Sequence, residues 1–163
     1  MKLLILFFTF LFHSEDLKKM RDDFNHMSKS EEVTTRMMDV STRSNSMSAP
    51  LKLAYYAASE MASAQYKFSP IAKLNAFNSG KKKLEKAALA DPENVEIRYI
   101  RYAIQCNAPS FLGYNKSIKE DRELIFKNLS ALKTKDIDLF SHICAYLLTR
   151  EKLTEAEKKQ ING

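Results

Sequence analysis

The sequence is poor in residues that turn or break a chain. Its 163 residues include three glycines and four prolines, and tryptophan is absent. We find no convincing run of alternating valine, isoleucine or threonine, so the pattern does not predict a β-sheet. Hydrophobic residues make up 45% of the chain, which is enough for one domain with a sizeable core. The sequence therefore predicts an all-α fold with about six helices in one domain.

Residues that carry out chemistry are also scarce. Beyond residue 14 the chain has two histidines, His26 and His142, and their separation does not fit a metal site. Asp136 and Asp138 point to different faces of a helix, so they would make a poor acid–base pair. Glycine-rich phosphate loops and nucleophile motifs do not occur. We therefore expect a protein that is not an enzyme and that holds neither a metal nor a cofactor.

Cysteine occurs twice, at Cys106 and Cys144, and both positions fall on apolar stripes of predicted helices. A disulfide between them would stabilise the fold by about 4 kcal/mol, provided that their Cβ atoms meet. Two buried thiols are the other interpretation, and the apolar setting of both residues favours it.

The first 14 residues are typical of a signal peptide. Lys2 precedes the ten-residue segment LLILFFTFLF, residues 3–12, and polar residues follow it. A helix that spans a bilayer needs about 20 apolar residues, so this segment is too short for one. We expect cleavage near His13 to Glu15 and an exported product, either periplasmic or secreted. An uncleaved membrane tether and an ordinary buried helix are the alternatives.

Positive charge exceeds negative charge, but the two signs are mixed along the chain. The formal net charge is +6, and acidic residues lie among the basic ones except in the run Lys81–Lys83. We interpret that run as a solvated helix face, with a patch for phosphate or anionic lipid as the alternative. A nucleic-acid partner is not expected, and a membrane partner is expected only if the signal segment stays uncleaved.

The rest of the chain divides into two predicted parts. Residues 15–49 form an N-terminal helical segment, which the polar linker STRSNSMSAP, residues 41–50, joins to the rest of the chain. Residues 50–163 form the main helical domain. Its first helix, residues 51–66, is rich in alanine, so a neighbouring helix can approach it closely. The next helix is predicted to run to Ala90, with a kink at residues 78–80.

Helix starts are marked by capping residues, whose side-chain oxygens accept hydrogen bonds from unpaired backbone N–H groups. A proline in the first turn of a helix costs no hydrogen bond there. Four starts are predicted on this basis: Ser69 with Pro70, Asp91 with Pro92, and the capping boxes Ser117 with Glu120 and Thr154 with Glu157.

The segment LEKAALADPEN resembles the end of the second helix of a tetratricopeptide repeat (TPR) and the turn after it. Gly80 and Ala87 match the small positions of that motif. Leu84 matches its large apolar position, and Pro92 matches its closing proline. The resemblance covers about 30 residues and implies a divergent, TPR-like domain of antiparallel helical hairpins. Domains of this kind mostly bind peptides or other proteins.

A longer segment, DPENVEIRYIRYAIQCNAPSFLGYNKSIKED, resembles members of a poorly characterised family of small exported bacterial proteins. This second resemblance implies no particular activity.

One candidate binding site is the loop NAPSFLGYN, residues 107–115. Its side chains Phe111, Leu112 and Tyr114 are too apolar for an ordinary connection, so something must cover them. The loop either folds back over the end of the core or presents these residues as a partner-binding tip.

A second candidate is the pair Arg98 and Arg101, which lie one helical turn apart and suit a carboxylate or phosphate ligand. Pairing within the protein is the alternative that we favour, because acidic residues follow in the next predicted helix: Glu120, Asp121 and Glu123.

These features lead to two hypotheses of function. The first is an exported helical protein–protein interaction module that docks a protein of the cell envelope. The second is a carrier that encloses a small anionic or lipid-like ligand in a cavity between helices. The first hypothesis expects Arg98 and Arg101 to be paired internally, whereas the second expects them to face the cavity.

Overall fold

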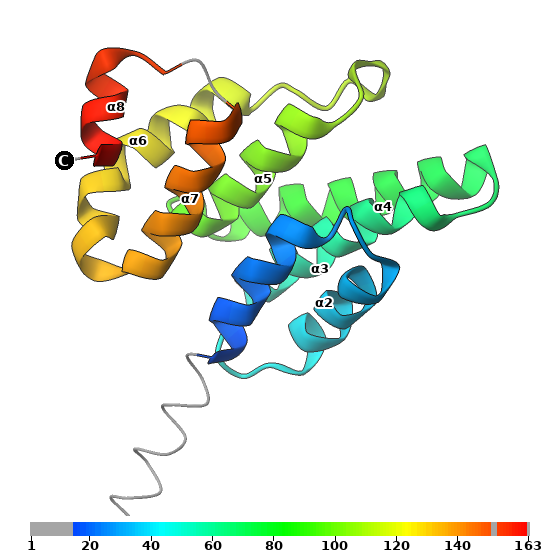
Figure 1. Ribbon diagram of the computed structural model, residues 1–163. Coiled ribbons are helices and arrows are strands. Elements are labelled where there is room, and N and C mark those ends of the chain that lie inside the picture. Colours follow the sequence, from blue (N-terminus) through cyan, green and yellow to red (C-terminus); the bar gives the residue numbers. More distant parts are fainter. Residues whose placement is uncertain (1–14, 151–152, 163) are drawn as a thin grey trace, which may run out of the picture. The chain divides into compact units, whose positions relative to one another are not determined.

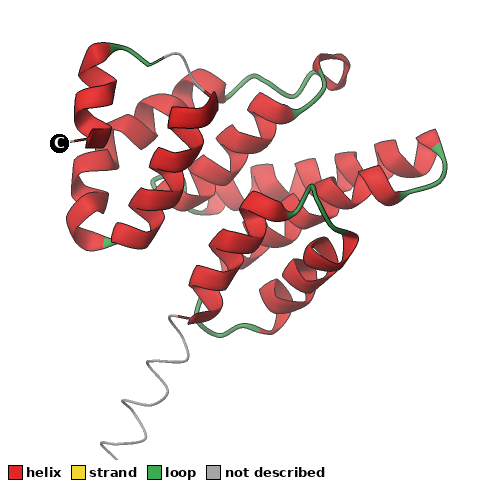
Figure 2. Cartoon of the chain, viewed as in Figure 1, coloured by secondary structure: helices red, strands yellow, loops and turns green. Residues whose placement is uncertain are grey.

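The fold is all-α, as the sequence predicts. The computed structural model describes residues 15–150 and 153–162, and this part of the chain contains helices and loops but no strand (Figures 1 and 2). The predicted signal peptide, residues 1–14, lies outside the described residues. Among the helices that are described, none is both long enough and apolar enough to cross a membrane.

More helices form than the six expected. Residues 15–26 are helical. The α-helices that follow are α2 (Glu31–Arg43), α3 (Ala49–Ser63), α4 (Pro70–Ala90), α5 (Val95–Asn107), α6 (Ile118–Lys135), α7 (Ile137–Arg150) and α8 (Glu155–Asn162), with short 3-10 helices η1 (Ala64–Tyr66) and η2 (Ser110–Leu112).

These helices form two compact units, of which one ends at Asp91 and the next begins at Pro92. This division differs from the boundary at residues 49 and 50 that the sequence suggested. The reason is that α2 packs against α3, so the N-terminal segment shares a core with the helices that follow it.

Ring packing and an ion pair connect the helices of the first unit. Phe24 meets Tyr55 of α3 edge to face, with ring centroids 6.2 Å apart. Arg36 of α2 reaches back to Asp23 with two hydrogen bonds, from Nε at 2.9 Å and from Nη2 at 2.7 Å. Residues 15–26 therefore pack against both α2 and α3.

The contact between α3 and α4 depends on small residues on both helices. Ala54, Ala57 and Ala58 of α3 are fully buried. Opposite them, a Cβ atom added to Gly80 would lie 2.4 Å from Met61 Cγ and 2.6 Å from the Ala57 carbonyl oxygen. Glycine therefore permits the close approach that the alanine-rich helix predicts. α4 runs as one continuous helix through residues 78–80, where a kink was expected.

One predicted helix start is confirmed and the next one is wrong. Ser69 Oγ accepts a hydrogen bond from Ala72 N at 3.1 Å, and Pro70 opens α4. The following helix, α5, begins three residues later than expected, because Asn94 rather than Asp91 caps it. Asn94 Oδ1 accepts two backbone hydrogen bonds, whereas Asp91 ends α4 by donating its N–H to Ala87 O.

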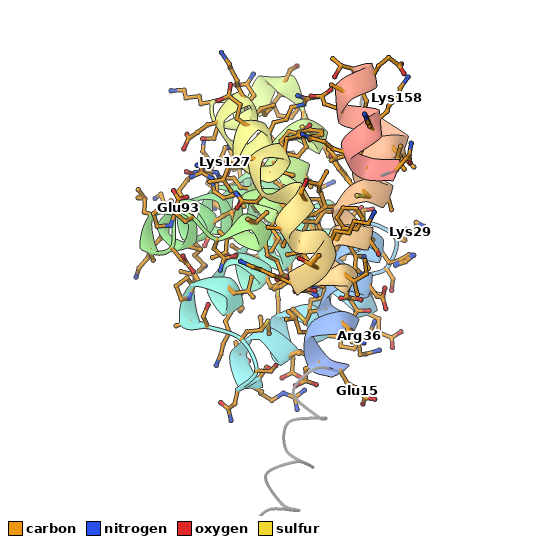
Figure 3. All side chains as sticks on the ribbon, turned by 90° about the vertical axis from the view of Figure 1, so that its left-hand side faces the viewer. Glu15, Lys29, Arg36, Glu93, Lys127 and Lys158 are labelled. Atoms are coloured by element: carbon orange, nitrogen blue, oxygen red, sulfur yellow. The ribbon has the colours of Figure 1, made fainter. Side chains whose placement is uncertain are left out.

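In the second unit α6 packs against α5, α7 and α8. Ring contacts join α5 to α7, since Tyr146 meets both Tyr99 and Tyr102 edge to face. On the outer faces of α6 and α8, Lys127 and Lys158 extend into solvent (Figure 3). The aliphatic core of this unit is fully buried at Ile97, Ile100, Ile125, Leu129, Ile143 and Leu147.

Candidate functional site

The two arginines of α5 are paired with carboxylates of α6. Arg101 donates hydrogen bonds to both oxygens of Asp121, from Nε at 2.8 Å and from Nη2 at 2.7 Å. Arg98 Nη2 pairs with Glu120. Arg98 Nε lies 2.5 Å from Asp121 Oδ1, close enough for an ion pair, although its N–H is not aligned for a hydrogen bond. This is the internal pairing that the sequence favours.

Burial makes this charge cluster unusual. The side chain of Asp121 is fully buried, and the side chains of Arg98 and Arg101 are almost so. Burial raises the pKa of Asp121, and the hydrogen bonds and charge of the two arginines oppose that rise. The hydrogen bond from Arg98 lowers the pKa of Glu120. Two guanidinium groups thus face two carboxylates, so their charges balance within the protein.

The 107–115 loop separates its apolar residues instead of presenting them together. Phe111 is 84% exposed, Leu112 is half-buried and Tyr114 is buried. The loop therefore combines the two alternatives for these residues, because Tyr114 returns to the core and Phe111 points into solvent.

The exposed end of this loop has a defined backbone. Leu112 N donates to Pro109 O and Gly113 N donates to Ser110 O, each at 3.0 Å. Gly113 then adopts a left-handed conformation with φ 59°, which glycine tolerates better than other residues. A hydrogen-bonded turn therefore holds Phe111 in solvent.

The capping box predicted for α6 is wrong. The Ser117 side chain makes no cap hydrogen bond, and Glu120 pairs with Arg98 instead of returning to Ser117 N. The Ser117 N–H donates to Gln105 Oε1 at 3.0 Å. The buried side chain of Gln105, on α5, thus supplies the acceptor that a capping box would have taken from Glu120.

Both cysteines are thiols in the structure. Cys144 is buried, and burial raises the pKa of its thiol. Cys106 is exposed, so the prediction of two buried thiols holds for one of the two residues. Among the described residues, no three histidine, cysteine or acidic side chains gather as a metal site would require.

A second exposed apolar feature was missed by the sequence analysis. We call it the α3–α4 tip and define it as residues 67–75, the connection into α4 and its first turns. Phe68 is fully exposed, Ile71 is 73% exposed and Leu74 is also exposed. The only sequence signal is the three-residue spacing of these apolar side chains, which by itself is also typical of a core-facing stripe.

We compared the chain with protein-family models, with curated proteins and with solved structures, and none of them matches it. The functional inferences below therefore rest on this chain's own residues.

Proposed function

We propose that this protein is an exported helical protein–protein interaction module that docks a partner in the cell envelope through Phe111. The observation that carries the proposal is that a large aromatic side chain is held in solvent by a hydrogen-bonded loop. Large aromatic side chains contribute much of the binding energy when a partner buries them, because their burial removes a large apolar area from water.

The fixed conformation of the 107–115 loop also supports the proposal. A loop that is ordered before binding loses little conformational entropy on binding, so more of the contact energy appears as affinity. Buried Tyr114 fixes the loop on one side of Phe111, and the turn at Pro109 to Gly113 fixes its tip.

The charge cluster favours this proposal over the ligand carrier. A carrier of an anionic ligand needs positive groups directed at its cavity. Arg98 and Arg101 instead pair with Glu120 and Asp121 of α6. The interaction-module hypothesis predicts this internal pairing of the two arginines.

The TPR-like organisation belongs to the same proposal. Gly80, Leu84 and Ala87, which carry the resemblance, are all buried. The close contact of α3 with α4 at Gly80 is the kind of packing that a helical hairpin requires. Export rests on the apolar segment at residues 3–12.

Site-specific photo-crosslinking in the native cell tests the proposal. A photoreactive side chain replaces Phe111 in one variant and Leu148, which is also an exposed apolar residue, in a matched control. We expect a discrete protein adduct from position 111 that position 148 does not form, and recovery of a mature chain without residues 1–14. An absence of adducts at 111, or the same adducts at both positions, would contradict the docking role. An intact N-terminus would contradict cleavage of the segment.

A further inference from the structure

The α3–α4 tip combines exposed apolar side chains with positive charge. All residues from Lys67 to Asn75 are exposed except Ala72, which is half-buried. This run contains three large apolar side chains, at positions 68, 71 and 74, together with two lysines, Lys67 and Lys73. Several large apolar side chains exposed together in this way mark a surface that contacts a partner or a membrane.

The segment that contains the tip carries charge of a single sign. Between Met61 and Leu84 the sequence has five lysines and no aspartate or glutamate. The carboxylate that precedes this segment, on Glu60, accepts hydrogen bonds from Lys83 Nζ at 2.6 Å and from Ser79 Oγ at 3.0 Å. Lys83 thus offsets the charge of Glu60, and the lysines nearest the tip keep an excess of positive charge.

We infer that the α3–α4 tip docks on the surface of an anionic lipid bilayer. Phe68, Ile71 and Leu74 enter the boundary between headgroups and acyl chains, while Lys67 and Lys73 lie against the headgroup phosphates. Apolar side chains and lysines both contribute to interfacial binding, and neither contribution has to be large alone.

A bilayer fits this tip better than an acidic protein surface does. The apolar residues lie at the end of the α3–α4 hairpin, on the connecting loop and the first turns of α4 (Figure 1). A folded protein partner must provide a matching hollow to bury Phe68, whereas fluid lipid adapts to the shape that enters it. The inference concerns residues other than Phe111 and does not depend on the proposed function.

Tryptophan fluorescence can test the inference in the full chain. The protein has no tryptophan, so Phe68→Trp introduces the only indole. We expect its emission to shift to the blue, and brominated acyl chains to quench it, with vesicles that contain phosphatidylglycerol. The matched variant is Phe111→Trp, another highly exposed aromatic position, whose emission is expected to stay unchanged. Because the indole reports its own surroundings, vesicle binding by residues 3–12 does not produce the signal.

The role of the lysines is tested in the same Phe68→Trp background. Lys67→Gln together with Lys73→Gln is expected to weaken binding to the anionic vesicles by about thirtyfold. Lys127→Gln together with Lys159→Gln removes the same charge from exposed positions elsewhere and is expected to leave binding unchanged.

Three outcomes would overturn the inference. The first is the absence of a blue shift at position 68 with anionic vesicles. The second is an equal shift with phosphatidylcholine alone, which would remove the role of the lysines. The third is a shift with soluble polyglutamate but not with vesicles, which would identify an acidic protein surface as the partner.

Discussion

At the scale of single residues, Asp121 shows how a buried charge can hold two helices together. Its carboxylate lies between two guanidinium groups of α5 and has no exposed surface. Forming such a cluster brings little net stability, because all of its members lose their hydration. Removing one member is costly, because the remaining charges stay buried without a counter-ion.

We therefore expect Asp121→Asn to reduce the free energy of unfolding by about 3–5 kcal/mol. Asparagine keeps the shape of the side chain but leaves Arg98 and Arg101 without a charged partner in the interior. Urea denaturation followed by circular dichroism measures the change. The control is Glu120→Gln, whose native side chain is 66% exposed and whose loss is expected to cost less than about 1 kcal/mol. Equal costs for the two variants would contradict a structural role of the buried cluster.

The spacing of Arg98 and Arg101 was visible in the sequence, and so were the acidic residues that pair with them. The contribution of Gln105 was not visible, because its acceptor meets Ser117 N only after α5 and α6 have packed together. The exposure of Phe68 was also not predictable, since an apolar residue in a sequence does not reveal what covers it.

At the scale of helices, one of the two predicted capping boxes forms, although an arginine of α6 also bonds its glutamate, and the other does not. The capping box at Thr154 and Glu157 forms as predicted, with Thr154 N donating to Glu157 Oε2 at 2.8 Å and Glu157 N donating to Thr154 Oγ1 at 3.3 Å. The equivalent box at Ser117 does not form: Glu120 pairs with Arg98, and the Ser117 N–H donates to Gln105 Oε1 instead. Helix content followed from composition, whereas the start of α6 depended on a tertiary contact with Gln105, and at α5 the nearby Asn94 took the cap in place of Asp91.

The Thr154–Glu157 cap makes α8 sensitive to acid. Hydrogen bonds from Arg122 and from Thr154 lower the pKa of Glu157 to about 2, against 4.5 for an ordinary glutamate. A lowered pKa in the folded state means that the ionised side chain stabilises the fold above pH 4.5. This stabilisation is lost progressively as the pH falls from 4.5 to about 2.

NMR titration of the Glu157 carboxyl carbon, combined with amide protection factors for α8, measures this effect. We expect protection in α8 to fall across that pH range in the native protein and to be low at neutral pH in Glu157→Gln. Glu155→Gln is the matched control, because Glu155 begins the same helix, its side chain is 89% exposed, and it pairs with Lys158 of the same helix at 2.7 Å. If Glu157 titrates at its ordinary pKa, the acid sensitivity of α8 has another source.

At the scale of the whole molecule, the chain forms two compact units, so we expect a packing defect in one unit to leave the other unit intact. The helix boundary predicted at Asp91 and Pro92 does not by itself mark a boundary between compact units, and composition does not change there. The close approach of α3 and α4 at Gly80 lies within the first unit. A substitution at this point therefore tests both the packing and the division.

We expect Gly80→Ala to destabilise the first unit by about 1–3 kcal/mol, because its new methyl group would overlap Met61 and the Ala57 backbone. In an exposed helix the same substitution would stabilise by up to about 1 kcal/mol, so the sign of the effect is diagnostic. Hydrogen exchange read by mass spectrometry should show lost protection in α3 and α4 and unchanged protection in α6 to α8. Asn78→Ala, on the exposed face of α4, is the control and should leave both units protected. A stabilised Gly80→Ala protein would mean that α3 and α4 lie farther apart, whereas equal loss in both units would mean that the chain opens as one cooperative body.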